Sequence, residues 1–169
     1  MTLHAIGHTA RALCAVSLVI APLALAAAPA HAVTSCTVNG VPRSGPTVNG
    51  TAGSDSIVCP SVDPGHSVKG LGGDDYIVLT GTTAGTVSGG QGRDYVTSRS
   101  NVLVTGLLQG NESSDYLVVD GRVAPGGIVR GSTGNDYRGV NANDGTANGG
   151  EGFDARQVNV GRPPITCEY

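Results

Sequence analysis

Six aspartates recur at intervals of 18 to 21 residues, and their carboxylates are the groups of this chain best suited to bind a ligand or a metal ion. They are Asp55, Asp75, Asp94, Asp115, Asp136 and Asp154. A carboxylate in a turn can bind a hard cation or accept hydrogen bonds from nearby backbone N–H groups. Carboxylates stacked one strand spacing apart, ~4.8 Å, repel by roughly 1 kcal/mol in water and more where water is excluded. Such a column needs a counter-ion or protons to relieve the repulsion.

Each aspartate ends a six-residue motif that opens with glycine. The opening glycines are Gly50, Gly70, Gly89, Gly110, Gly131 and Gly149. Two residues before each of them stands an apolar residue, and a polar residue follows it directly, as in Val68 and Lys69. This alternation is kept in register through all six copies and predicts a strand with one buried face before every motif.

A second strand is predicted after each aspartate. The second residue past the aspartate is apolar in the first four copies, which place Ile57, Ile77, Val96 and Leu117 there. A period near 20 residues is typical of a solenoid. The sequence therefore predicts an all-β fold, a parallel β-roll or β-helix solenoid of about six coils with about 20 residues per coil. Small aliphatic side chains can fill so thin a core, which explains a chain with 27 glycines, one Phe and no Trp.

The motif resembles the nonapeptide G-G-x-G-x-D-x-U-x of the RTX or haemolysin-type calcium-binding repeats, in which U is a large apolar residue. The resemblance covers about residues 48 to 158. It implies Ca²⁺ held between stacked turns by the six aspartates and the six opening glycines. The chain departs from the family pattern at Ser113, which replaces the fourth-position glycine, and at Arg138 and Arg156, which replace U. The second-position glycine is kept only at Gly90 and Gly150.

Calcium takes about six to eight oxygen ligands, which carboxylates and the carbonyls of glycine-rich turns can supply. Six stacked turns enclose five gaps, so five ions is the upper limit. The alternative is that each aspartate only caps its turn by accepting hydrogen bonds from local backbone N–H groups. The sequence leaves both interpretations open.

Four tyrosines follow consecutive motif aspartates and are expected to form an exposed ladder. They are Tyr76, Tyr95, Tyr116 and Tyr137. One interpretation is mutual stacking that stiffens the sheet. The other is a platform for sugar rings, which would make the protein a non-catalytic polysaccharide-binding or adhesion module.

The chain is expected to divide into four segments. Residues 1–32 are predicted to be a secretory signal peptide, with an apolar run and an Ala30-His31-Ala32 cleavage site. The apolar run contains Pro22 and is shorter than the ~20 residues of a membrane span, so no span is expected after cleavage. Residues 33–47 are expected to form an N-terminal cap, 48–160 the repeats, and 161–169 a C-terminal tail or cap.

Three cysteines lie beyond the expected cleavage site. Cys36 and Cys59 are separated by just over one coil, so we expect them to form a disulfide that closes the N-terminal cap. His66 is the only histidine there, and it is expected in a turn without a catalytic partner. Scattered arginines and a net charge of −3 give no basic patch for nucleic acid.

Together these features predict a secreted bacterial protein that binds calcium and has a structural or cell-surface role. A small hydrolase or lyase is the weakest hypothesis, because no loop is long enough to build a catalytic cleft. The expected partners are calcium ions and, in the alternative function, an extracellular polysaccharide or a cell surface.

Cys167 is predicted to form a disulfide between two copies of the chain. If Cys36 pairs with Cys59, Cys167 lies several coils away, which at ~4.8 Å per coil is beyond the reach of a disulfide. Oxidised protein should therefore show a dimer band on non-reducing electrophoresis, and Cys167→Ser should abolish it. Peptide mapping that joined Cys167 to Cys36 or Cys59 would contradict this prediction.

Overall fold

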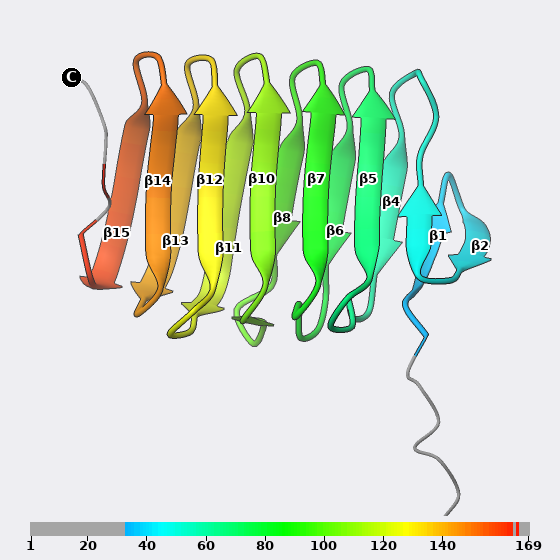
Figure 1. The fold of residues 1–169 in the computed structure, drawn as a ribbon, viewed down its shortest axis with the longest axis horizontal. Helices are drawn as coiled ribbons and strands as arrows, with labels where there is room; N and C mark the ends of the chain where they lie inside the picture. The colour runs from blue at the N-terminus through cyan, green and yellow to red at the C-terminus, as the bar shows by residue number, and fades with distance from the viewer. Residues whose placement is uncertain (1–32, 164, 166–169) are drawn as a thin grey trace, which may run out of the picture. The chain divides into compact units, whose positions relative to one another are not determined.

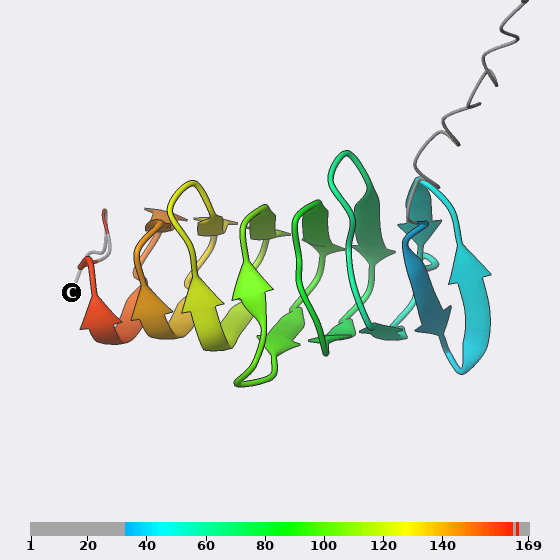
Figure 2. The same cartoon turned by 90° about the horizontal axis from the view of Figure 1, so that it is seen from below.

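The computed structural model describes residues 33–163 and 165, and these form an all-β solenoid of about six coils. Figure 1 shows the strands of successive coils lying side by side in two sheets. The predicted fold class is confirmed. Seen at right angles, the chain passes from one layer to the other in every coil (Figure 2). The predicted signal peptide and Cys167 lie outside the described residues.

Each coil contributes one strand to each sheet. The strands before and into the motif form a six-stranded parallel sheet of β3 (Thr47–Asn49), β5 (Ser67–Gly72), β7 (Thr86–Gln91), β10 (Leu107–Glu112), β12 (Ile128–Thr133) and β14 (Thr146–Glu151). The strands after the aspartates are β4 (Ser56–Cys59), β6 (Tyr76–Leu79), β8 (Tyr95–Ser98), β11 (Tyr116–Val123), β13 (Tyr137–Asn143) and β15 (Ala155–Gly161). A short strand, β9 (Leu103–Val104), pairs with the end of β11. Equivalent motif positions are in register between coils, so the sequence repeat and the structural repeat coincide.

The core is a single layer of side chains between the two sheets. Columns of Val, Ile and Leu point inward, including Val68 and Val87 from one sheet and Ile57 and Ile77 from the other. Arg138 occupies the inward column of β13 and is also buried. Because each coil packs mainly on its two neighbours, the fold is stabilised by local stacking rather than by one large core.

The N-terminal end is closed by a hairpin of β1 (Ser35–Val38) and β2 (Val41–Ser44). Asn39 and Gly40 form its two-residue turn with positive φ at both positions, as a tight hairpin requires. Strand β1 pairs antiparallel with β4, and the Cys36–Cys59 disulfide joins these two strands with an S–S distance of 2.09 Å. The predicted disulfide is confirmed.

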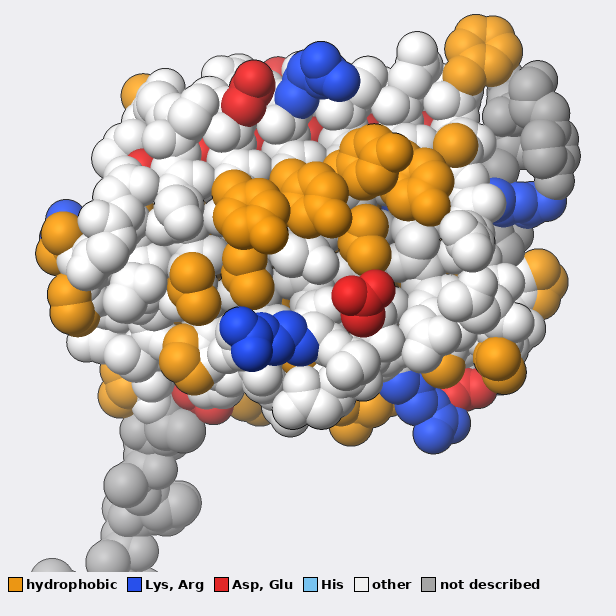
Figure 3. Space-filling model, turned by 180° about the vertical axis from the view of Figure 1, so that it is seen from behind, with side chains coloured by type: hydrophobic (Ala, Val, Ile, Leu, Met, Phe, Trp, Pro, Cys, Tyr) orange, Lys and Arg blue, Asp and Glu red, His pale blue; other side chains and the backbone are white. Residues whose placement is uncertain are grey.

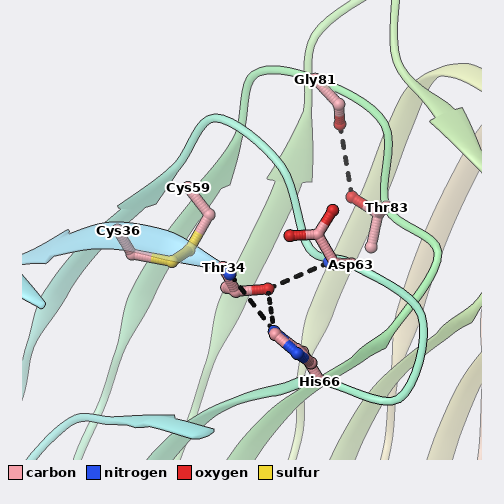
Figure 4. Close-up of a disulfide and its surroundings, with 7 residues drawn as sticks. All are labelled: Thr34, Cys36, Cys59, Asp63, His66, Gly81 and Thr83. Carbon is pink, nitrogen blue, oxygen red and sulfur yellow. Dashed lines mark hydrogen bonds between the residues drawn. A yellow bond between two sulfur atoms is a disulfide. The ribbon is translucent and has the colours of Figure 1, made fainter. Parts of the chain in front are cut away.

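His66 belongs to this cap and is half-buried rather than fully solvated. Its Nδ1 lies 3.0 Å from Thr34 Oγ1 and accepts a hydrogen bond from the Thr34 backbone N–H (Figure 4). Thr34 Oγ1 also accepts a hydrogen bond from the Asp63 N–H at 3.0 Å. Thr34 is completely buried, and its hydrogen bonds with Asp63 and His66 join the start of the cap to the first coil.

The second and fourth motif positions have positive φ in all coils after the first. Glycine meets this need at most of these positions, but Leu71, Asn111, Ser113 and Ser132 adopt it with a side chain. A non-glycine residue held in such a region costs roughly 1–3 kcal/mol. Glycine is therefore favoured, though not required, at the second and fourth motif positions.

Ser132→Gly is expected to stabilise the protein by about 1 kcal/mol, because relief of backbone strain exceeds the entropy that glycine adds to the unfolded chain. Ser132 has φ 97°. Urea unfolding of residues 33–169 measures the effect, and Ser132→Ala, which keeps a Cβ, should give no gain. A lower midpoint for Ser132→Gly would contradict the strain argument.

Candidate functional site

The six motif aspartates form one buried column at the edge of the solenoid. Their exposed fractions are only 1 to 5 %. Each aspartate lies at the start of a strand of the second sheet, directly before Ser56, Tyr76 or the equivalent residue. Burial of six carboxylates in one line is unusual, since a charged group loses its hydration there.

A chain of hydrogen bonds links the aspartates from coil to coil. The backbone N–H of Asp55 donates to Oδ1 of Asp75 at 2.8 Å, and that of Asp75 donates to Oδ1 of Asp94 at 2.9 Å. The same bond joins Asp94 to Asp115, Asp115 to Asp136 and Asp136 to Asp154 at 2.8 to 3.0 Å. From Asp75 onward, each carboxylate thus caps the turn of the preceding coil rather than its own turn.

The second carboxylate oxygen is buried without a donor in five of the six aspartates. Oδ2 of Asp75, Asp94, Asp115, Asp136 and Asp154 has no hydrogen-bond partner among the described residues. A buried polar atom without a partner costs roughly 1–3 kcal/mol, and more when it is charged. These five oxygens therefore define the part of the column that the protein alone does not satisfy.

The opening glycines make room for these oxygens. A Cβ added to Gly70 would lie 1.9 Å from Asp75 Oδ2 and 2.5 Å from the carbonyl oxygen of Gly89 in the next coil. At Gly131 the corresponding oxygens are Asp136 Oδ2, at 1.9 Å, and the Gly149 carbonyl, at 2.4 Å. Two oxygen acceptors from adjacent coils thus face the same small space. Two electronegative oxygens that face one small space favour a proton or a cation there.

Asp55, at the N-terminal end, differs from the other five. Its Oδ1 accepts a hydrogen bond from Asn39 Nδ2 at 2.6 Å, and its Oδ2 accepts one from the Thr51 backbone N–H at 2.5 Å. The hairpin supplies the donor to Oδ1, and Thr51 of the first motif supplies the donor to Oδ2 that the later coils lack. The six aspartates are equivalent in the sequence, because the spacing between Asn39 and the first motif gives no indication of this contact.

Burial raises the pKa of the central carboxyl groups. Loss of hydration is the main cause, and repulsion by neighbouring carboxylates adds to it, whereas the hydrogen bond from the preceding coil opposes it. The pKa of Asp75 rises to about 6, and those of Asp94 and Asp115 rise to about 7. The pKa of Asp136 is raised for the same reason, and Arg138 opposes the rise. Asp94 and Asp115, in the middle of the column, are therefore close to titration at neutral pH.

A second ladder of side chains lies beside the first and was not predicted. At the fifth motif position, Ser54 Oγ accepts from the Asp74 N–H, and Asp74 Oδ1 accepts from the Arg93 N–H at 2.8 Å. Ser114 and Asn135 do the same in later coils. The short polar side chains that recur at the fifth motif position were the only sign of this ladder in the sequence. In the aspartate column each N–H donates to the following coil, whereas in the second ladder each N–H donates to the preceding coil. Together they provide acceptors for the backbone N–H groups at the fifth and sixth motif positions.

The carboxylates alone do not make a complete metal site. Among the described residues, no three side chains of His, Cys, Asp or Glu converge on one point. A cation in the column would need the backbone carbonyls of the turns as additional ligands, as calcium sites commonly use.

The four tyrosines form the predicted ladder on the outer face of the second sheet. Their rings stack on one another with centroids 4.4 to 5.8 Å apart and planes within 22° of parallel. Figure 3 shows them as an unbroken row of hydrophobic side chains across this face. Mutual stacking covers the faces between neighbouring rings and leaves mainly their edges toward solvent.

No family model, curated protein or solved structure matches the chain. Within residues 33–163 and 165, the chain forms no helix of the length and hydrophobicity needed to cross a membrane. Function is therefore inferred from the geometry of the site.

In the absence of divalent cations, the protein should become less stable as pH rises from 5 to 8. The folded-state pKa values of Asp75, Asp94 and Asp115 lie above the ordinary 3.8, so the folded state binds more protons across this range. Stability is then complete below about pH 4 and declines through pH 6 to 7. Thermal unfolding in chelator at pH 5, 6, 7 and 8 measures this dependence, and a rising Tm would contradict it.

Proposed function

We propose that this protein is an exported calcium-binding repeat protein whose coils are fastened to one another by ions in the aspartate column. The observation that carries the proposal is the set of five buried Oδ2 atoms that lack donors. Two of them, those of Asp75 and Asp136, also share a small space with a carbonyl oxygen of the adjacent coil. A hard dication is attracted to such a cluster of oxygens.

The residues in the column fit calcium by their chemistry. Asp75, Asp94, Asp115, Asp136 and Asp154 would supply carboxylate oxygens, and opening-glycine carbonyls such as those of Gly89 and Gly149 would complete the set. Calcium would supply the positive charge that the stacked carboxylates require. Asp55 already has donors from Asn39 and Thr51, so it needs an ion least.

Protons are the competing means of neutralising the column. With pKa values of about 6 to 7, Asp75, Asp94 and Asp115 lose much of their proton above neutral pH. Calcium can then replace the protons where it is abundant, and extracellular calcium modules bind with Kd of about 10⁻⁴ to 10⁻³ M. The proposal therefore places the protein outside the cell, where the Cys36–Cys59 disulfide would also persist.

The proposed role is structural rather than catalytic. The conserved positions of the repeat serve the turn itself, through positive φ, close glycine contacts and carboxylate caps. Ion binding at successive gaps would stiffen the whole array, because each ion would touch two coils. Such a rod suits a protein that displays a surface at or beyond the cell envelope.

Calcium is expected to raise the stability of residues 33–169 at pH 8, by roughly 1.4 kcal/mol for each site when free calcium is ten times Kd. Calorimetric titration and urea unfolding with and without chelator measure binding and stability. Asp94→Asn, which mimics the protonated carboxyl, should stabilise the chelated protein and weaken calcium binding. If calcium changes neither signal while Asp94→Asn still stabilises, protons alone neutralise the column and the proposal fails.

Position along the column should matter as well. Asp94→Ala is expected to lower calcium affinity more than Asp154→Ala, because Asp94 lies between two other ladder carboxylates whereas Asp154 ends the ladder near Arg156. Parallel calorimetric titrations of the two variants compare them directly. Equal losses would show that the gaps are equivalent.

A further inference from the structure

A hollow interrupts the outer face of the second sheet at Gly139. In register with Gly139, the four preceding coils carry the β-branched residues Val58, Val78, Thr97 and Val118. Glycine leaves the space of one such side chain empty. Its φ is not in the left-handed region, and a Cβ there would meet Tyr137 at 3.6 Å and Val118 at 3.8 Å, which are ordinary contacts. Neither the backbone nor the packing demands glycine at this position.

The hollow is lined by groups of mixed character. Tyr137 and Val118 form its apolar side, and Asp120, Asn141, Gln157 and Asn159 form its polar side. Its volume is about 280 Å³, which is near the lower end for small-molecule sites, about 300 Å³. It adjoins the end of the tyrosine row, on the face that Figure 3 presents.

The polar side chains of the hollow are held in place by one another. Tyr137 Oη donates to Gln157 Oε1 at 3.3 Å, and Gln157 Nε2 donates to Asn159 Oδ1 at 3.1 Å. Asn159 Nδ2 in turn donates to Asn141 Oδ1 at 3.3 Å. An ordered set of side chains loses less conformational entropy when a ligand binds, so the network favours binding.

The chemistry of the lining selects one class of ligand. Amides and a carboxylate offer donors and acceptors to hydroxyl groups, while the tyrosine ring and Val118 offer an apolar surface. Asp120 disfavours an anion, and the nearby Arg122 is already paired with Asp144. A sugar ring combines hydroxyl edges with an apolar face and fits both sides of the hollow.

We propose that the Gly139 hollow binds one pyranose ring of a neutral oligosaccharide. The ring packs its apolar face against Tyr137 and Val118 and directs hydroxyl groups toward Asp120 and Asn141. The ligand class is thus a neutral glycan, and the site is separate from the aspartate column. The inference does not depend on calcium binding and can succeed or fail independently of it.

The test is a titration of ¹⁵N-labelled residues 33–169, in millimolar calcium, with cellohexaose, chitohexaose and mannohexaose, and with polygalacturonate as an anionic comparison. At least one neutral oligosaccharide should shift the side-chain amide signals of Asn141, Gln157 and Asn159 with a saturable dependence. Absence of shifts with all three neutral oligosaccharides, or shifts with polygalacturonate alone, would overturn the proposal.

Gly139→Val provides the decisive variant, because it restores the side chain that the other coils carry. It should weaken binding of the active oligosaccharide at least tenfold while leaving Tm unchanged or higher. Asp120→Asn should weaken binding more modestly. Thr97→Val, in the same column two coils away, is the matched control and should bind like the unaltered protein. Equal binding by Gly139→Val and the unaltered protein would exclude this hollow as the site.

Discussion

The fold depends on how the turn amides are satisfied. Parallel strands pair their own backbone groups with the coils on either side, but at the turns the chain must find other acceptors. The hydrogen bond from each motif aspartate N–H to Oδ1 of the next aspartate meets this need at five successive steps. This hydrogen bond requires that each carboxylate be buried between two coils. The glycine contacts, the raised pKa values and the unsatisfied Oδ2 atoms all follow from that burial.

The repeat could be predicted from the sequence because each structural position of the coil carries the same type of residue in nearly every copy. Alternating apolar and polar positions, glycine spacing and one aspartate per period are sufficient to define two strands and a turn in each coil. The disulfide was predicted from a spacing of just over one coil, but Cys36 lies on a cap strand that pairs antiparallel with β4 rather than in a preceding coil. Positions that obey the period were therefore predictable.

Features that break the period were not predictable in this way. The contacts of Asn39 with Asp55 and of His66 with Thr34 arise where the hairpin meets the first coil, and no repeat unit describes them. The direction of the aspartate bonds was also missed, because a local turn cap and a bond to the neighbouring coil use the same residue types. Gly139 occupies the same repeat position as Val118 and Thr97, but the side chains that line its hollow come from neighbouring coils and were not predicted to meet there.

The two ends of the array are built differently. The first coil is covered by a disulfide-linked hairpin that supplies Asn39 to its carboxylate, whereas most side chains of the last strand, β15, are exposed. Each aspartate from Asp75 onward caps the coil before it, so a new coil added after β15 would bring its own cap for Asp154 and cover the core face of that strand. A coil inserted before the hairpin would instead separate Asn39 from Asp55. Duplication of a repeat can therefore lengthen the array at its C-terminal end without new capping residues. At the N-terminal end the hairpin would have to change as well.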